Sequence, residues 1–536
     1  MAANVKAIEN NGAYYVVPEN INTVVVTADQ LAAAISNGGV IAVMADIDMA
    51  NSWTSVRPTK ELTILGNGNI ITNLNLPLLA GNVSTKLTID GLTIADSVVA
   101  PAANENGLGS AAFVPYVDAA GYVTLTDCHI KNSTISATER AGGLVGYTSG
   151  SSLTIKDCSV EGCTITGIGG AAGLVAYSQS VTTIENSSVK NSNVTATEDR
   201  LGTKAPLAGA VIGTINANTA LTNVTVSGNT VSNNNATAVL NQYAGRWVAG
   251  ELTIDGAVVA ATADDLADAI ANGEKNVNVA QDMTITGSTL SGAADDLTVT
   301  LGADTTVTVT SGAAASKDIT ITGDKSSKVV LVNTNPGYEG KLSYQDGANL
   351  TFKGITFDAN EISGICARGG VVTFIDCFVT GELEQTIASK FVFSGCTFDV
   401  GVTQVGYGCP DVVFEGCTFE TDGYGIKIYK EANENVVNLT VKDCSFKNTG
   451  SDARSAILLD HILDGFSYNI TVENCTFEGY TTTPTATYNM WAERMIVADS
   501  FVKTADGQYI FSYQTGAEGG AYHKILTADK LVVTVQ

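Results

Sequence analysis

The amino-acid sequence predicts an all-β protein made of two tandem parallel β-helices, each introduced by a short capping helix. Two observations support this fold class. Short β-strand patterns recur at a nearly constant interval, and one helix-plus-strand pattern occurs twice, at 27–43 and again at 262–279. Such repetition indicates a solenoid, in which each coil buries its apolar side chains against the next.

The first half repeats on a nearly constant interval. Cys128 and Cys158 are 30 residues apart (158 − 128), and so are Leu144 and Leu174 (174 − 144). Because two different strand patterns keep the same interval, one interval corresponds to one coil. Alternation of apolar and polar residues places every second side chain inside. The strand patterns of one series begin at Leu87, Val123, Leu153, Thr183, Leu221 and Leu252.

The second half has less regular coils that are rich in Phe and Cys. Successive Cys residues from Cys377 to Cys475 are 19, 21, 27 and 31 residues apart (396 − 377, 417 − 396, 444 − 417, 475 − 444). Each follows Asp, Gly or Asn, residues that tolerate the left-handed backbone of a sharp bend. The long intervals predict loops on one side, at 418–438 and 446–468, and we expect any recognition surface there.

The helix patterns set the predicted domains. Thr27 is placed to cap a helix over 27–38, with Gln30 completing a capping box and Gly38 ending it, and the copy covers 262–273. A helix over the open end of a solenoid covers its unpaired strand edge. The predicted parts are listed here: an N-terminal arm at 1–22, a first β-helix at 23–259, a second β-helix at 260–500, and closing antiparallel strands at 501–536.

Charge and hydropathy restrict the classes of partner. The 536-residue chain has a formal net charge of −26, which disfavours binding to nucleic acids and to anionic membrane surfaces. No apolar run approaches the roughly 20 residues that span a bilayer. The first residues lack the apolar stretch of a secretory signal, so we expect either a protein that is not exported by the usual route or one whose signal has been removed.

Most of the 10 cysteines follow the strand patterns at the bends. Their register predicts an internal stack of small, buried, reduced thiols, with Ser187 and Ile355 in the same position on other coils. The alternatives are a disulfide framework and a metal site. No Cys-x-x-Cys motif occurs, which disfavours zinc. Unpaired thiols favour folding in a reducing compartment.

The densest titratable cluster is the segment around Asp460 and His461. Together with Tyr429 and Asp443 on nearby coils, it is predicted to form a small ligand-binding site, with an ordinary polar loop as the alternative. His129 is expected to be an outward side chain. The sequence predicts no catalytic residue, metal ligand or cofactor.

A carbohydrate-cleaving β-helix would need paired outward carboxylates, or a carboxylate with calcium and a basic group. Asp411, Glu415 and Asp443 are the candidates for such a group, although acidic residues at bends are also common for turn formation.

The coils resemble the pectate-lyase-like right-handed parallel β-helix superfamily over most of residues 40–500. The runs at 142–147 and 172–177 resemble Gly-Leu-rich repeats of surface proteins from gut Bacteroidota. This resemblance implies a right-handed coil. No position matches the basic and calcium-binding residues of the lyases, so the resemblance implies no catalytic residue. Similar β-helices also occur in phage fibres, tailspikes and capsid decorations.

These features lead us to expect a non-enzymatic structural or interaction protein at the virion surface, either a phage fibre (including a head fibre) or a capsid decoration. The alternatives are an exported adhesin-like protein of the bacterial cell surface and a polysaccharide lyase or hydrolase. The expected partners are other virion or cell-surface proteins and host surface glycans. A homo-oligomer, such as a trimer, is expected for a fibre.

Overall fold

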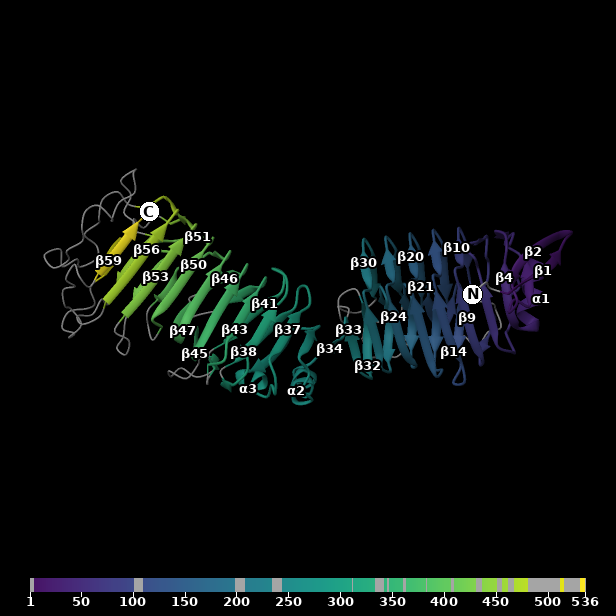
Figure 1. Ribbon diagram of the computed structural model, residues 1–536, viewed down its shortest axis with the longest axis horizontal. Helices are drawn as coiled ribbons and strands as arrows, with labels where there is room; N and C mark the ends of the chain where they lie inside the picture. Colours follow the sequence, from purple (N-terminus) through teal and green to yellow (C-terminus); the bar gives the residue numbers. More distant parts are fainter. Residues whose placement is uncertain are drawn as a thin grey trace. The chain divides into compact units, whose positions relative to one another are not determined.

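The computed structural model describes most of the chain. The described residues are 4–100, 109–197, 208–233, 243–310, 312–332, 342–344, 347–359, 363–381, 383–405, 409–429, 436–450, 456–460, 467–480, 511–514 and 531–535. The chain divides into two compact units, Met1–Val258 and Val259–Gln536, called unit 1 and unit 2 below. Within each unit, strands from successive coils stack in parallel (Figure 1).

Unit 1 has five stacks of parallel strands in its described part, named the first to fifth sheets in the order in which a coil visits them. The first sheet contains β3 (Thr23–Val25), β4 (Gly39–Val43), β6 (Leu62–Leu65), β9 (Lys86–Asp90), β14 (Tyr122–Thr126), β19 (Ser152–Lys156), β24 (Val181–Glu185), β29 (Thr219–Thr222) and β33 (Leu252–Ile254). The second sheet contains β5 (Ile47–Asp48), β7 (Ile70–Thr72), β10 (Thr93–Ala95), β15 (His129–Lys131), β20 (Ser159–Glu161), β25 (Ser188–Lys190) and β30 (Thr225–Ser227).

The remaining sheets of unit 1 are shorter. The third sheet contains β11 (Val98–Val99), β16 (Thr134–Ala137), β21 (Thr164–Gly167), β26 (Asn193–Ala196) and β31 (Thr230–Asn233). The fourth contains β12 (Ser110–Ala111), β17 (Arg140–Gly142), β22 (Gly170–Ala172) and β27 (Ala208–Gly209). The fifth contains β8 (Asn82–Val83), β13 (Val114–Val117), β18 (Val145–Thr148), β23 (Val175–Ser178), β28 (Ile212–Asn216) and β32 (Ala244–Ala249).

Unit 2 has a three-sided coil. Its first sheet contains β35 (Asn276–Val279), β37 (Leu297–Leu301), β40 (Ile319–Thr322), β43 (Leu350–Lys353), β45 (Ser363–Ile375), β47 (Leu383–Ser394), β50 (Asp411–Glu415), β53 (Val436–Lys442), β56 (Ser467–Glu473) and β59 (Leu531–Val535). The second contains β36 (Met283–Thr286), β38 (Thr306–Thr310), β41 (Lys328–Val332), β44 (Thr356–Asp358), β46 (Phe378–Thr380), β48 (Thr397–Phe398), β51 (Thr418–Thr421), β54 (Ser445–Asn448) and β57 (Thr476–Glu478).

The third side of unit 2 is less continuous. It contains β39 (Gly312–Ala315), β42 (Leu342–Tyr344), β49 (Val402–Val405), β52 (Ile426–Tyr429), β55 (Ile457–Asp460) and β58 (Phe511–Gln514). The N-terminal parts of β45 and β47 join this side before running on into the first sheet. The in-register parallel stacking in both units confirms the predicted all-β solenoid fold class.

A helix near the start of each unit buries its apolar side chains. Helix α1 spans Ala28–Asn37 and buries Leu31, Ala34 and Ile35. Helix α2 spans Ala263–Ala271, and a short helix α3 spans Gly287–Leu290. Thr262 and Asp265 form a reciprocal capping box at α2. At α1, Thr27 caps Gln30 N, but the Gln30 side chain accepts from Val26 N instead of completing the predicted box.

The strands at the two ends of the chain pair within their own units. The N-terminal arm is an antiparallel hairpin of β1 (Val5–Asn10) and β2 (Ala13–Pro18), and its Val17 packs with Ile21, Val24 and Ala42 of the first coils. The short strand β34 (Ala257–Ala260) pairs antiparallel with β33. At the other end, the predicted antiparallel closing strands are wrong for the described residues. Strands β58 and β59 instead pair in parallel with β55 and β56, because they keep the apolar alternation that lets them join the stacks.

The bends carry the left-handed residues that the sequence predicted. Asp127, Asp157 and Asn186 occupy the same bend on three successive coils, with φ angles of 48°, 55° and 47°. Asn and Asp enter this region more readily than other side chains. The next residue along points inward, so that the bend is followed by a buried Cys128, Cys158 or Ser187. The nine cysteines whose side chains the structure describes form no disulfide, and all but the partly buried Cys475 are buried, which confirms the predicted internal stack.

The Cys163 thiol is held as a neutral hydrogen-bond donor. Cys163 Sγ donates to the carbonyl of Glu161 at 3.2 Å, and burial raises the pKa of this thiol. Ser133 and Ser192 take the same position on the adjoining coils and donate equivalent bonds at 2.8 and 2.9 Å. A thiol and a hydroxyl therefore satisfy this position in the same way.

We expect Cys163→Ser to leave the free energy of unfolding within about 1 kcal/mol of wild type, since the hydroxyl reproduces a bond already made on both neighbouring coils. Cys163→Val should cost about 1–3 kcal/mol, because it removes the donor and adds bulk to a packed core. Urea unfolding of the two variants measures the difference. Equal losses would contradict the equivalence of thiol and hydroxyl.

Candidate functional site

The four residues predicted as a binding site do not form one cluster. Tyr429 ends β52 and Asp460 ends β55, and the two are paired directly across adjoining coils. They lie where the third side of the unit 2 coil ends, and the structure describes their backbone only. His461 lies outside the described residues.

Asp443 lies at another corner of the coil, between the first and second sheets. It has a φ of 53° at the bend after β53, and it accepts a hydrogen bond from Asn474 Nδ2 at 3.1 Å. The whole of β53 separates this corner from the ends of β52 and β55, and a strand of that length spans roughly 23 Å. The structure therefore pairs Tyr429 with Asp460 and places Asp443 elsewhere, as a bend residue.

The three candidate carboxylates are also divided. Asp411 begins β50 and forms an ion pair with Lys390, with Nζ and Oδ2 3.3 Å apart. Glu415 ends the same strand, with its backbone paired to Lys442, the residue before Asp443. Glu415 and Asp443 are thus exposed side chains at the same corner on adjoining coils, while Asp411 is occupied by its lysine at the far end of the strand.

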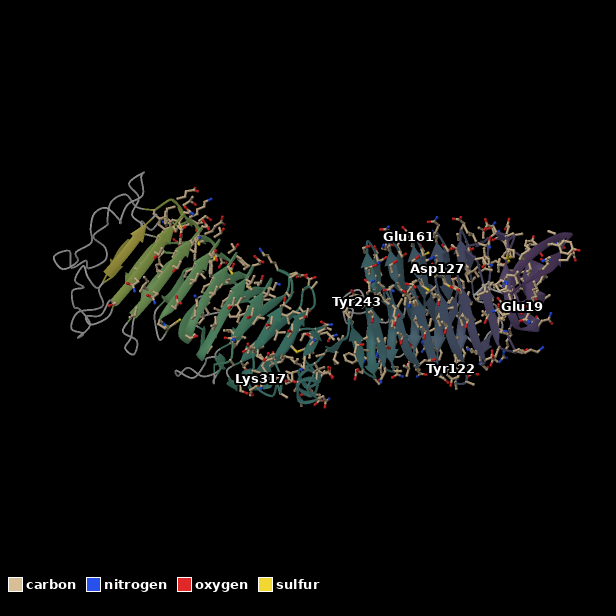
Figure 2. All side chains as sticks on the ribbon, viewed as in Figure 1. Glu19, Tyr122, Asp127, Glu161, Tyr243 and Lys317 are labelled. Atoms are coloured by element: carbon tan, nitrogen blue, oxygen red, sulfur yellow. The ribbon has the colours of Figure 1, made fainter. Side chains whose placement is uncertain are left out.

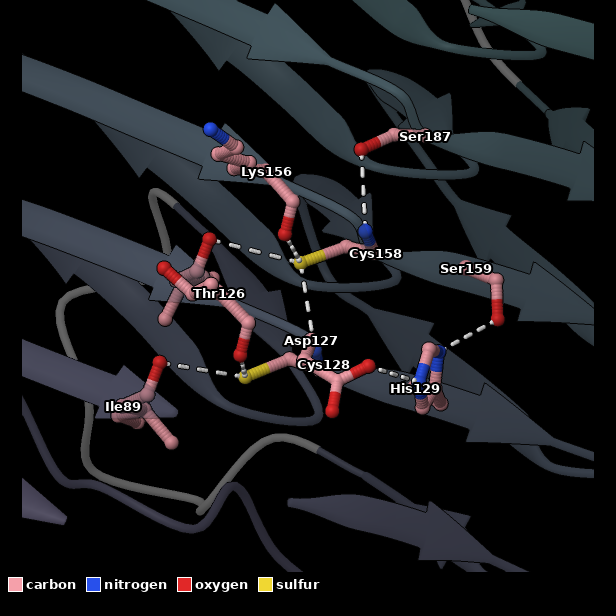
Figure 3. A network of polar contacts seen from close by, with 10 residues as sticks. Ile89, Thr126, Asp127, Cys128, His129, Lys156, Cys158, Ser159 and Ser187 are labelled. Atoms are coloured by element: carbon pink, nitrogen blue, oxygen red, sulfur yellow. Dashed lines mark hydrogen bonds and ion pairs between the residues drawn. The ribbon is translucent and has the colours of Figure 1, made fainter. Parts of the chain in front are cut away.

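A different polar network in unit 1 joins an aspartate, a histidine and a serine (Figure 3). His129 Nδ1 lies 2.8 Å from Ser159 Oγ, and His129 Nε2 lies 3.0 Å from Asp127 Oδ1. The exposed fractions of the His129 and Asp127 side chains are 28% and 60%, so this network is open to solvent. Asp127 is visible at the surface of the unit in Figure 2.

The coil geometry fixes this network. Strands β15 and β20 pair so that His129 faces Ser159 on the next coil. Between Asp127 and His129, Cys128 points inward, and its backbone N–H donates to Cys158 Sγ at 3.4 Å. A hydrogen bond with the Cys158 thiol, together with burial, raises the pKa of Cys128 and keeps it neutral. Asp127 and His129 therefore point outward on either side of the buried Cys128.

Sequence reasoning identified His129 as outward but missed its partners. The signal was present in the repeat, because the interval that aligns Cys128 with Cys158 also aligns His129 with Ser159. A serine hydroxyl bonded to an imidazole whose other nitrogen meets a carboxylate is the arrangement used to activate a nucleophile.

A row of aromatic side chains lies on the outer face of the fifth sheet of unit 1. Tyr116, Tyr147 and Tyr177, called the tyrosine row below, stack on successive coils with ring centroids 5.0 and 4.9 Å apart and ring planes within 2° and 7°. The rings are half-buried. Their stacked faces cover one another, so the ring edges and hydroxyls point outward.

Polar and cationic groups surround the tyrosine row. Tyr147 OH donates to Gln179 Oε1 at 2.7 Å, and the Arg140 guanidinium carbon lies 5.1 and 4.5 Å from the ring centroids of Tyr147 and Tyr177. Burial raises the pKa of Tyr147, so its hydroxyl remains a donor at neutral pH. The row thus combines apolar rings, neutral hydroxyls, amides and one cation.

Two other kinds of site are absent from the described residues. No group of three or more His, Cys, Asp or Glu side chains converges there as a metal site. Within the same residues, no helix is long and apolar enough to cross a membrane.

Comparison with known proteins gives structural similarity only. No protein-family model matches the chain, and no curated protein matches it. A solved structure from Bacteroides ovatus, provisionally assigned as an immunoglobulin A1 protease, is 12% identical, with a TM-score of 0.28 over 64% of this chain and 76% of that chain. A variant of the PL6-family alginate lyase AlyGC is 9% identical, with a TM-score of 0.28 over 96% of this chain and 100% of that chain.

A further similar structure is the alginate lyase AlyF-OU02 in complex with G6, 12% identical, with a TM-score of 0.16 over 96% of this chain and 88% of that chain. These findings correct one prediction. The sequence led us to expect a protein without enzymatic activity, but several of the similar solved structures are enzymes. A non-enzymatic character is therefore no longer expected.

Proposed function

We propose that this chain is a β-helix protein that binds glycans through the tyrosine row of unit 1. The observation that carries the proposal is the in-register stack of Tyr116, Tyr147 and Tyr177 beside Arg140. Tyr and Arg are enriched among the residues that contribute most of the binding energy at recognition surfaces. Because the ring faces cover one another, the row offers a ligand its hydroxyls, its ring edges and the Arg140 guanidinium. Sugars present many hydroxyl groups that can hydrogen-bond to such groups.

The repeat of the coil suits an extended ligand. Each coil adds one tyrosine, and neighbouring coils are about 4.8 Å apart. Polar groups flank the hydroxyls along the row: Ser149 Oγ is 3.0 Å from Tyr116 OH, and Asn216 Nδ2 donates to Tyr177 OH at 3.4 Å. A polysaccharide lying along the row would meet the same kinds of group on each coil.

The wider role that we propose is display on a phage virion, as a fibre or a capsid decoration, with other virion proteins and host surface glycans as partners. The nine described cysteine side chains form no disulfide, which supports assembly in a reducing compartment. An exported protein of the bacterial cell surface is the second candidate. Mass spectrometry of purified virions from a phage that encodes this chain distinguishes them: absence of the chain from the particle would refute virion display.

We expect Tyr147→Ala to weaken glycan binding by at least about tenfold, because the central ring contacts both neighbours and carries a hydroxyl. Binding is measured by isothermal titration against purified bacterial polysaccharides, both neutral and uronate-containing, chosen from a glycan array. Tyr122→Ala is the matched control, since Tyr122 is an exposed tyrosine, 54% accessible, on the first sheet of the same unit.

Wild-type affinity should survive in the Tyr122→Ala variant. If no glycan binds the wild-type chain, or if Tyr147→Ala and Tyr122→Ala bind equally well, the tyrosine row is not the binding surface.

A further inference from the structure

We propose that Ser159, His129 and Asp127 form a nucleophilic site that hydrolyses short-chain carboxylic esters, such as O-acetyl groups. This inference goes beyond glycan binding and does not depend on it, because the tyrosine row lies on the fifth sheet and these residues lie on the second sheet and the bend before it. The proposal rests on two contacts of the His129 imidazole. Its Nδ1 lies 2.8 Å from Ser159 Oγ, and its Nε2 lies 3.0 Å from Asp127 Oδ1.

The three side chains fit three distinct roles. In the tautomer with its proton on Nε2, His129 donates to the Asp127 carboxylate and presents Nδ1 as an acceptor to the Ser159 hydroxyl. Ser159 is then the nucleophile, His129 the general base, and Asp127 the positioning residue that fixes the ring. The same roles occur in hydrolases on unrelated folds, which are recognised by geometry.

The rigid stack holds this geometry without a ligand. Backbone pairing fixes His129 opposite Ser159, and the buried Cys128 and Cys158 anchor the two bends beneath them. Thr93 is the backbone partner of His129 on the preceding coil, so the strand that carries His129 is paired on both sides. The contacts with Ser159 and Asp127 favour one orientation of the ring.

The reaction balances without a cofactor. Nδ1 of His129 takes the Ser159 proton while Oγ forms a bond to the ester carbonyl carbon. The resulting tetrahedral intermediate collapses, the alcohol oxygen leaves, and it receives that proton. Water then attacks the acyl-serine, His129 takes a water proton and returns it to Ser159 Oγ, and the carboxylic acid is released. The net change is ester plus water to acid plus alcohol.

The surroundings restrict the substrate and the rate. The Ser159 backbone N–H donates to the carbonyl of Cys128 at 3.0 Å, so the strand ladder uses the donor that often stabilises the oxyanion. Ser188 is the backbone partner of Ser159 on the next coil, on the side away from His129. We expect slow turnover of small esters on exposed ligands, because this network is open to solvent.

A fluorophosphonate probe tests the nucleophile directly. The full-length chain is incubated with the probe, and the modified residue is found by intact mass and peptide mapping. We expect a single modification at Ser159 and at least about a hundredfold slower labelling in His129→Gln, since general-base catalysis contributes about that much or more. Ser188→Ala is the matched control and should label at the wild-type rate, because it removes a hydroxyl from the same sheet that has no histidine beside it.

Asp127→Asn tests the positioning residue. Asn is accepted at this bend, since Asn186 takes the equivalent position two coils further on, so the fold should be kept. Labelling should slow, and the ratio of the two His129 ring tautomers, read from the ¹⁵N shifts of the imidazole, should change, because an amide can either donate to or accept from Nε2. A merely structural role would leave the tautomer ratio unchanged.

Turnover is measured with para-nitrophenyl acetate, with Ser159→Ala as the reference for background hydrolysis. Each variant is first checked by circular dichroism and thermal unfolding. Wild type should release nitrophenol faster than Ser159→Ala. The proposal is overturned if Ser159 is labelled no faster than Ser188, if labelling persists in His129→Gln, or if wild type and Ser159→Ala hydrolyse the ester equally.

Discussion

Replacing Phe393 by alanine should lower the free energy of unfolding of unit 2 by about 3–5 kcal/mol. Phe393 is fully buried in a column of rings, with its centroid 4.9 Å from that of Phe374 and 4.8 Å from that of Phe414. It also meets Phe398 on the second sheet at 5.5 Å. The substitution removes the buried area, both stacking contacts and the edge contact, and it leaves a cavity inside a rigid coil.

The position in the middle of the column increases the effect. Each coil of a solenoid is stabilised mainly by its two neighbours, so a cavity here weakens two interfaces at once. The measurement is urea unfolding followed by circular dichroism. Val413→Ala is the control, because Val413 is a half-buried residue on the next strand of the same sheet, and it should cost under about 1 kcal/mol. Similar losses for both variants would show that the ring column is not the core of unit 2.

The fold was predictable because a solenoid repeats regularly along the sequence. Inward residues alternate along a strand, and they must fit the residues stacked above and below them on the adjoining coils. The buried positions therefore recur in the sequence at the interval of the coil. Leu153 and Ile155 are buried at the positions that their alternation predicts, and Phe374, Phe393 and Phe414 stack at the positions that their Cys-containing bends predict. The bends follow from the residues that accept a left-handed backbone.

The predicted site was less predictable for a physical reason. Two residues are neighbours on a solenoid only if they share a position on adjoining coils or lie at the same corner. Tyr429 and Asp460 satisfy the first condition, whereas Asp443 stands at another corner, with the length of β53 between. Closeness in the sequence suggested one cluster, but the coil separates its members.

In unit 1, the His129 network and the tyrosine row show the opposite case. His129 and Ser159 are distant in the sequence and adjacent in space because one coil separates them. Tyr116, Tyr147 and Tyr177 form a row for the same reason. The repeat contained both alignments, but the outward positions vary from coil to coil and do not appear as a pattern. Function on this fold depends on those varying positions, whereas the fold depends on the constant ones.

Gly66 is a position in unit 1 where one added methyl group should have a large effect. A Cβ built there would lie 2.3 Å from the carbonyl oxygen of Gly91 and 2.6 Å from the Cα of Leu92. Both are backbone atoms of the next coil, and Gly66 N donates to the carbonyl of Asp90 at 2.6 Å. The methyl group can fit only if two coils separate. We expect Gly66→Ala to cost about 3 kcal/mol or more, at the upper end of overpacking effects.

Gly68→Ala separates this collision from ordinary backbone strain. Gly68 has a φ of 76°, and a Cβ there meets nothing within 4 Å, so alanine suffers only the left-handed penalty of about 1–2 kcal/mol. Both glycines belong to the same bend, and thermal unfolding of the two variants compares them directly. A larger loss for Gly68→Ala than for Gly66→Ala would mean that backbone conformation, and not the close approach of neighbouring coils, limits this bend. The opposite order would locate the limit at the spacing between coils, which is the dimension that the stacked hydrogen bonds hold fixed.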